Sequence, residues 1–212
     1  MDSHSQVLIV GAGIFGLSSA YHLARRFSLD ASRITLLDRS PAPSIPAAST
    51  DINKIIRADY SSPLYMNLGV EAIAAWKTHP FCDFYHQTGW IVLDEKNSDL
   101  AERIRANFRA CGREEGIADL TKEEVRSRWG GLLNDTDYSE FGKYYFNATA
   151  GWADAGAAIT WMANEVIRMG VKYRVGELKK IIPGDGGFFF NDTATTEIYT
   201  ADKVLLCTGA WT

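Results

Sequence analysis

Three glycines near the start of the chain have the spacing of a site for the diphosphate of a dinucleotide. Gly11, Gly13 and Gly16 follow an apolar run at residues 7–10 and open a helical pattern. In such a site the first glycine permits a tight turn, the second lets the main chain approach a pyrophosphate, and the third allows the helix to pack near the strand. The helix N-terminus then offers N–H groups and a partial positive charge to the phosphates.

An acidic residue, Asp38, follows where such a site contacts a ribose. It ends a second apolar run, residues 34–37, about 20 residues beyond the third glycine, and a carboxylate there accepts hydrogen bonds from ribose hydroxyls. The elements that position these groups are a strand at 7–10, a helix at 14–27 and a strand at 34–37. A fortuitous glycine turn is the alternative, and the order of strand, helix and acid disfavours it.

Composition narrows the function classes. The chain has 212 residues, 46% of them hydrophobic, which suits one large or two small globular domains. A net charge of −4 without a Lys/Arg cluster argues against a nucleic-acid partner. No apolar run approaches the roughly 20 residues that span a bilayer, and the first six residues lack the regions of a signal peptide, so we expect no membrane partner.

Cysteine usage suits a reducing compartment. The three cysteines, Cys82, Cys111 and Cys207, are odd in number and far apart, which excludes a disulfide framework. No cysteine pair or His/Cys cluster has the spacing of a metal site, so we expect no metal.

The remaining periodicity predicts a mixed α/β chain. Residues 39–50 are rich in Pro, Ser and Ala, which interrupts the strand–helix alternation of a nicotinamide dehydrogenase. In the helix predicted at 153–169, Ile159, Met162, Val166 and Ile167 are expected to face inward. The other predicted elements are an extended segment at 51–60, helices at 63–79 and 99–115, a helix opened by a capping box at Thr121, strands at 88–94 and 202–207, a strand-rich segment at 138–152, and a strand at 171–175 that continues toward Ile182.

The segment from Phe188 to Thr200 has two interpretations. Its Phe, Thr, Ile and Tyr residues around Asn191-Asp192 are typical of a β-hairpin. Residues 191–200 also match the translation of a common short-read sequencing adapter, and the Phe run matches a translated homopolymer. Resequencing the locus from unamplified DNA decides between the two.

Several stretches together resemble one family. They are GAGIFGLSSAYHLA, LLDR, DINKIIR, TGWIVLD, AGWADA and DKVLLCTGAW. They are similar to the FAD-dependent amine oxidases of the D-amino-acid-oxidase superfamily, within the group of sarcosine, fructosyl-amino-acid and saccharopine oxidases. Apart from residues 188–200, the resemblance runs from Val7 to Thr212, and the DINKIIR and TGAW stretches are its more specific parts.

The resemblance implies an α/β fold: a Rossmann-like FAD-binding domain with an interleaved α+β substrate domain. Residues 1–80 and 150–212 would form two parts of the FAD domain, and residues 81–149 a segment of the substrate domain. Because the chain ends directly after a strand, we expect a fragment truncated at the C-terminus, inactive by itself.

The resemblance also implies site residues. Lys54 matches a basic residue near the flavin ring, where a cation stabilises the negative charge left by hydride transfer. Arg57 could add to that field or bind a substrate carboxylate. The implied cofactor contacts are Gly11, Gly13, Ile14, Phe15 and Gly16 at the pyrophosphate, Asp38 and Arg39 at the adenosine ribose, Ser49 and Thr50 along the phosphate and ribityl chain, the backbone of Leu178 at the adenine, and Thr208, Gly209 and Ala210 from the last strand.

The implied activity is oxidation of the secondary amine of an amino acid to an imine, with release of hydrogen peroxide. Candidate substrates are N-methyl, glycated, saccharopine-like or cyclic amino acids, with oxygen as the second substrate. We expect a monomer in the cytoplasm or the peroxisome. An NAD(P)-dependent dehydrogenase and an inactive flavoprotein fragment are the alternatives; Asp38 would repel the 2′-phosphate of NADP.

Overall fold

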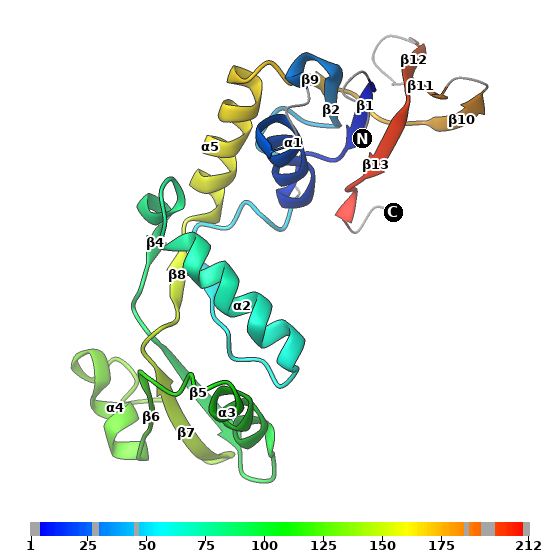
Figure 1. The fold of residues 1–212 in the computed structure, drawn as a ribbon. Helices are drawn as coiled ribbons and strands as arrows, with labels where there is room; N and C mark the ends of the chain where they lie inside the picture. Colours follow the sequence, from blue (N-terminus) through cyan, green and yellow to red (C-terminus); the bar gives the residue numbers. More distant parts are fainter. Residues whose placement is uncertain (1–4, 27–29, 45–46, 185–186, 192–197, 210–212) are drawn as a thin grey trace. The chain divides into compact units, whose positions relative to one another are not determined.

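The computed structural model describes residues 5–26, 30–44, 47–184, 187–191 and 198–209. The chain divides into two compact units (Figure 1). The first unit consists of Met1–Ile52 and Ala155–Thr212, and the second of Asn53–Asp154. Each unit has its own sheets and helices, so each is described by itself.

A parallel sheet forms the centre of the first unit. Its four strands pair in the order β13-β1-β2-β9, and Val10 lies opposite Leu37 on one side and Leu206 on the other. The carboxyl ends of β1, β2 and β13 therefore meet at one edge of the sheet, which brings together the residues that follow them. The strands are β1 (Val7–Val10), β2 (Ile34–Asp38), β9 (Lys172–Val175) and β13 (Lys203–Leu206).

Two helices of the first unit contact each other, α1 (Ile14–Arg26) and α5 (Ala155–Arg168) (Figure 1). The rings of Tyr21 and Trp161 meet edge to face at 6.0 Å. On α5, Ile159, Met162 and Val166 are buried as predicted, but Ile167 is 45% exposed. The prediction for Ile167 is wrong because one residue is a rotation of about 100° around a helix, which carries it off the buried stripe.

The strand predicted to continue from Val175 to Ile182 is also corrected. β9 ends at Val175, and residues 180–184 belong to a separate antiparallel sheet of order β10-β11-β12. Its strands are β10 (Lys180–Gly184), β11 (Gly187–Asn191) and β12 (Ile198–Ala201). The short helix η1 (Ala31–Arg33) also belongs to the first unit. β11 and β12 pair in antiparallel orientation, which agrees with the hairpin interpretation of residues 188–200. Its turn lies outside the described residues, and the origin of its codons stays a prediction.

The second unit holds two antiparallel sheets and three α-helices. Its core includes Ala58, Met66, Ile73, Phe108 and Tyr145. One sheet has the order β3-β8-β4 (Lys54–Ile56, Gly151–Ala153, Tyr85–His86), and the other β5-β7-β6 (Trp90–Glu95, Phe141–Asn147, Ile117–Asp119). The α-helices are α2 (Pro63–Trp76), α3 (Leu100–Ala110) and α4 (Lys122–Gly131), and η2 (Phe81–Phe84) is a short 3-10 helix.

The boundary of the second unit differs from the predicted segment boundary at residue 80. Residues 53–80 belong with the middle of the chain. The physical reason is that Met66 and Ile73 of α2 pack in one core with Ile104, Phe108 and Tyr145. Which of these segments contribute to cofactor binding stays a prediction.

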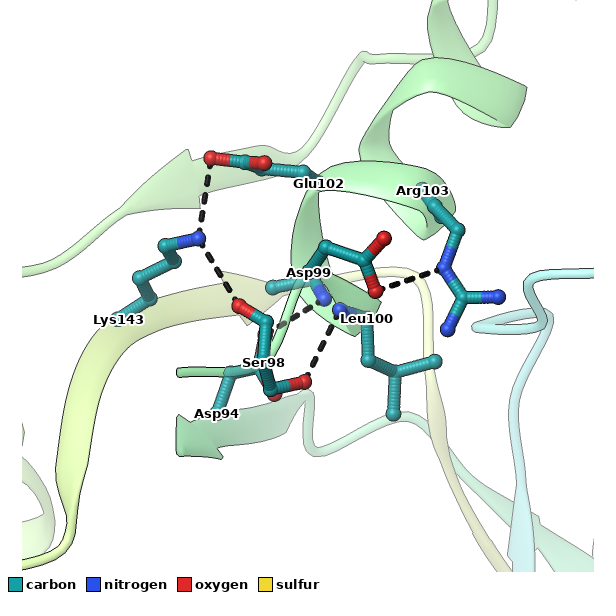
Figure 2. Close-up of polar contacts among 8 residues, drawn as sticks. Asp94, Ser98, Asp99, Leu100, Glu102, Arg103 and Lys143 are labelled. Atoms are coloured by element: carbon teal, nitrogen blue, oxygen red, sulfur yellow. Dashed lines mark hydrogen bonds and ion pairs between the residues drawn. The ribbon is translucent and has the colours of Figure 1, made fainter. Parts of the chain in front are cut away.

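Polar side chains cap the starts of two helices of the second unit, α3 and α4. The capping box at Thr121 is confirmed, with Glu124 as its second member. At the start of α3, the Asp94 carboxylate accepts a hydrogen bond from the Ala101 N–H at 2.8 Å, and the Ser98 hydroxyl accepts one from Leu100 at 3.1 Å (Figure 2). These groups satisfy N–H donors that a helix start leaves unpaired. The helix ends at Ala110, short of the predicted residue 115.

Gly16 generates a prediction about stability. A Cβ at this position would lie 1.8 Å from the Gly11 carbonyl oxygen. Gly16→Ala should therefore lower the free energy of unfolding by about 2 kcal/mol or more, because α1 must move away from the strand. Urea unfolding measures this change. Gly13→Ala is the matched control, and an equal loss in both variants would contradict the explanation.

Candidate functional site

The turn between β1 and α1 is bonded to both neighbouring strands. The Gly11 N–H donates to the Leu37 carbonyl at 2.8 Å, and the Cys207 N–H donates to the Val10 carbonyl at 2.7 Å. The Ala12 N–H donates to Asp38 Oδ2 at 2.7 Å. The main chain of this turn is therefore held before any ligand arrives.

Two of the three glycines are required by the protein itself. Gly11 has a φ of +101°, and a Cβ there would lie 2.3 Å from the Cys207 carbonyl oxygen. Gly16 is excluded from carrying a Cβ by the Gly11 oxygen. Both positions tolerate only glycine because backbone, which cannot rotate away, fills the space.

Gly13 differs, since the protein leaves room for a side chain there. A Cβ at Gly13 would meet nothing closer than the Ala47 Cβ and the Ser49 Oγ, both at 3.8 Å. The Ser49 hydroxyl is buried and has no hydrogen-bond partner in the described part of the chain. An open glycine beside an unpaired hydroxyl is a cradle that suits a phosphate, whose oxygens accept hydrogen bonds.

The first turn of α1 favours an anion at the same place. None of its residues, all of which the structure describes, is acidic. Its N–H groups lack intrahelical acceptors and carry the positive end of the helix dipole. Ile14 and Phe15 are 45% and 75% exposed, so neither apolar side chain is buried in the core of the unit.

Asp38 is oriented by donors on both of its oxygens. Oδ1 accepts from the Ser40 N–H at 3.0 Å and from the Ser44 hydroxyl at 3.0 Å, whereas Oδ2 accepts from Ala12. Oδ2 thus keeps capacity for a further donor such as a ribose hydroxyl. The Tyr173 hydroxyl donates to the Ser40 carbonyl at 2.8 Å. Burial, and to a smaller extent the negative charge of Asp38, raises the pKa of the Tyr173 phenol.

Ser40 and Ser44 were not among the residues predicted from the sequence. The Asp-x-Ser pattern at residues 38–40 could have predicted the contact of Ser40, because an Asp carboxylate often accepts a hydrogen bond from the backbone N–H two residues later.

The other expected cofactor residues of the first unit lie in several places. Thr50 donates its hydroxyl to the Ala47 carbonyl at 2.9 Å, so it shapes the loop that carries Ser49. Leu178 packs against the buried cluster formed by Leu8, Val10, Leu37 and Ala201. Arg39 is exposed. Thr208 and Gly209 follow Cys207 at the end of β13, and Gly209 has a φ of +62°. Ala210 lies outside the described residues. Their contacts with a cofactor stay predictions.

The two expected catalytic cations belong to the second unit. Lys54 begins β3, where it pairs with Ala153 of β8. Arg57 follows β3, and its Nη1 donates to the Asp59 carbonyl while its guanidinium lies 4.6 Å from the centre of the Tyr60 ring. Arg57 and Tyr60 line two adjoining cavities of about 610 and 320 Å³. A guanidinium in such a place suits a carboxylate.

Asp59 is a buried acid that sequence analysis missed. It is 2% exposed, and its carboxylate accepts from the Tyr145 hydroxyl at 2.8 Å and from Asn147 Nδ2 at 3.0 Å. Burial raises the pKa of the Asp59 carboxyl above its ordinary 3.8, and the two hydrogen bonds offset only part of that rise. No local pattern could have found this cluster, because Asp59 and β7 are far apart in the sequence.

Other reactive residue types form no further centre. Within the described ranges, no group of three or more His, Cys, Asp or Glu side chains could hold a metal ion. Cys82 and Cys111 are exposed, and burial raises the pKa of the half-buried Cys207 thiol. None of the helices in the described segments combines the length and apolar character that crossing a bilayer requires.

Comparison with known proteins identifies the family. A family model for FAD dependent oxidoreductases, DAO, matches residues 6–212. The chain belongs to the FAD dependent oxidoreductase family. This membership favours FAD over a nicotinamide cofactor at the β1–α1 turn, as the sequence predicted.

Relatives agree with this membership. L-saccharopine oxidase of Schizosaccharomyces pombe is 30% identical over an alignment 221 residues long, which covers 97% of this chain and 51% of that protein. Peroxisomal sarcosine oxidase of Homo sapiens is 26% identical, over 97% of this chain and 50% of that protein. The crystal structure of fructosamine oxidase (Amadoriase II) from Aspergillus fumigatus in complex with FSA is 32% identical with a TM-score of 0.81, over 98% of this chain and 49% of that one. The predicted fold class is confirmed, and the chain spans about half the length of these relatives.

The buried acid gives a pH prediction. Because the folded-state pKa of Asp59 is raised, its contribution to stability is fully present below the unfolded pKa near 3.8 and is lost as pH rises through the folded pKa. Asp59→Asn removes this titration. The free energy of unfolding of the wild type, relative to that of Asp59→Asn, should fall with rising pH by at most about 1.4 kcal/mol per pH unit. Urea titrations between pH 4 and 8 measure it, and a difference that rises with pH would contradict the assignment.

Proposed function

We propose that this protein binds FAD at the β1–α1 turn and, within the complete flavoprotein, oxidises the secondary amine of an amino acid. The observation that carries the proposal is the pairing of Gly13, which has room for a Cβ, with the unpaired hydroxyl of Ser49. Glycine at Gly13 is not needed for the protein's own packing. A ligand that approaches the main chain explains it.

The residues of the first unit would divide the cofactor among them. The N–H groups of Gly13 to Gly16 and the Ser49 hydroxyl would donate to the diphosphate, with Ile14 and Phe15 flanking it, and Asp38 would accept from the adenosine ribose. The further contacts proposed are Arg39 at the ribose, Thr50 along the ribityl chain, the backbone of Leu178 at the adenine, and Thr208, Gly209 and Ala210. When bound, FAD supplies an acceptor for a hydride equivalent and a route for electrons to oxygen.

The cations of the second unit would serve the reacting groups. The Lys54 ammonium would stabilise negative charge that develops on the acceptor, because a fixed charge in a water-poor site needs no reorganisation. The Arg57 guanidinium would bind the substrate carboxylate with two parallel hydrogen bonds and so orient the amine.

The proposed reaction conserves electrons and protons. The substrate loses one hydrogen from the carbon beside nitrogen and one from nitrogen, as two electrons and two protons, and the C–N bond becomes C=N. Oxygen takes up the same two electrons and two protons and leaves as hydrogen peroxide. Water then adds to the imine and releases an amine and a carbonyl compound.

The relatives support the substrate class and a compartment. Their names give saccharopine, sarcosine and fructosamine as compounds that those proteins act on, and the human relative is called peroxisomal. We therefore propose an amino-acid-derived amine and oxygen as substrates, and the peroxisome or cytoplasm as the location. We also propose that the protein is a monomer.

Gly13→Ala tests the cofactor site. The added methyl group should weaken FAD binding by tenfold or more because it occupies space proposed for the diphosphate, while the stability of the FAD-free protein should change by less than about 1 kcal/mol. Calorimetric titration of the FAD-free complete flavoprotein gives the dissociation constant. Ser49→Ala should weaken binding in the same direction. Wild-type affinity in both variants would overturn the proposed site.

Lys54→Met tests the activity. Peroxide release is measured with L-saccharopine, N-methylglycine and a fructosyl amino acid, and the wild-type holoenzyme should oxidise at least one. Lys54→Met should slow flavin reduction or reoxidation by tenfold or more in stopped-flow traces, with normal flavin content. Lys77→Met, an exposed lysine at the C-terminal end of α2, is the control. Unchanged half-reactions would leave Lys54 without a catalytic role.

A further inference from the structure

Asp59 is bonded to strand β7 through its side chain and to Arg57 through its main chain. Its two carboxylate oxygens accept from Tyr145 and Asn147, both on β7, at 2.8 and 3.0 Å. The amide of Asn147 is itself fixed, because its Oδ1 accepts from the N–H and the hydroxyl of Thr149 at 2.9 and 2.7 Å. The NH₂ group of Asn147 must therefore face residue 59. An NH₂ group only donates, so the side chain at residue 59 must supply an acceptor.

Arg57 depends on this segment for its position. Its guanidinium donates to the backbone carbonyl of Asp59 and lies over the ring of Tyr60. Any shift of residues 59 and 60 would move both groups that hold the guanidinium. Arg57 lines the two cavities described above, so its position sets where a carboxylate can bind in them.

The main chain around Asp59 is clamped from two further sides. Helix α2 approaches so closely at Gly69 that a Cβ there would lie 2.9 Å from the Ala58 Cα and 2.9 Å from the Arg57 carbonyl oxygen. From α3, Asn107 Nδ2 donates to the Tyr60 carbonyl at 3.1 Å. The Asp59 side chain is the part of this clamp that reaches β7. Because it is buried, its loss leaves the donors of Tyr145 and Asn147 without an acceptor.

We propose that Asp59 is a positioning residue that fixes the Arg57 guanidinium for a substrate carboxylate. This inference rests on the proposed function, in which Arg57 binds that carboxylate. Asp59 does not touch substrate; it ties the turn after β3 to β7, and the turn holds Arg57. A role limited to folding would lower stability and leave carboxylate recognition unchanged, so the two roles differ in a measurable way.

The test compares Asp59→Asn with Asp94→Asn in the FAD-loaded holoenzyme. Asp94 is the matched control, since it is a buried aspartate of the same unit whose contact is with the start of α3 (Figure 2). The bound flavin is kept chemically reduced, so that it cannot oxidise the ligand. Dissociation constants are then measured by calorimetry for whichever of N-methylglycine, L-saccharopine and a fructosyl amino acid the wild type binds most tightly, and for the primary amide of that acid. Asp59→Asn should weaken binding of the acid by tenfold or more and of the amide by less than twofold, with normal flavin content. Asp94→Asn should change neither by more than twofold.

Arg57→Ala provides the second arm. If Asp59 acts through Arg57, Asp59→Asn should have no further effect on acid binding in the Arg57→Ala background. Equal losses for acid and amide, or a full additional loss in that background, would overturn the positioning role. Because the measurement is binding, an enzyme that binds the acid but releases no peroxide would refute the proposed oxidation and still decide the role of Asp59. A wild type that binds none of the three acids would overturn both.

Discussion

Backbone crowding at the end of β1 is the constraint on which the first unit depends. The carbonyl oxygens of Gly11 and Cys207 occupy the space that side chains at Gly16 and Gly11 would need. The turn is therefore pressed between β13 and the start of α1, and its N–H groups bond to Leu37 and Asp38. This packing leaves one face of the turn, at Gly13 and Ser49, open for a ligand. The proposed cofactor site thus follows from where the protein fills space and where it does not.

Asp38 in the first unit and Asp59 in the second are each held in a fixed orientation. Asp38 is surrounded by N–H and hydroxyl donors and keeps one oxygen with spare capacity, which suits contact with a ligand. Asp59 is buried among protein donors and contacts a strand, which suits a structural link. The two carboxylates have the same chemistry, and their surroundings give them different roles.

The sequence predicted the local parts of this structure and missed the distant ones. The strand, helix and strand at residues 7–38 were predicted because periodicity and glycine spacing are local signals. Asp59, Tyr145 and Asn147 were missed because their contacts join segments that only the folded second unit brings together. Ile167 was placed inward because a helical stripe was read one residue too wide. The boundary at residue 80 was set by a resemblance, whereas the packing of α2 against α3 and β7 sets the boundary of the compact unit.

Amide hydrogen exchange of the complete flavoprotein, with and without FAD, tests the central claim most directly. It reports individual N–H groups, so it can locate the diphosphate without relying on activity. FAD should slow exchange at the amides of Gly13 to Gly16 at least tenfold, while Ile9 and Leu36 in the buried strands change little. Saturating FAD that leaves these amides unprotected, and protects others instead, would contradict the account.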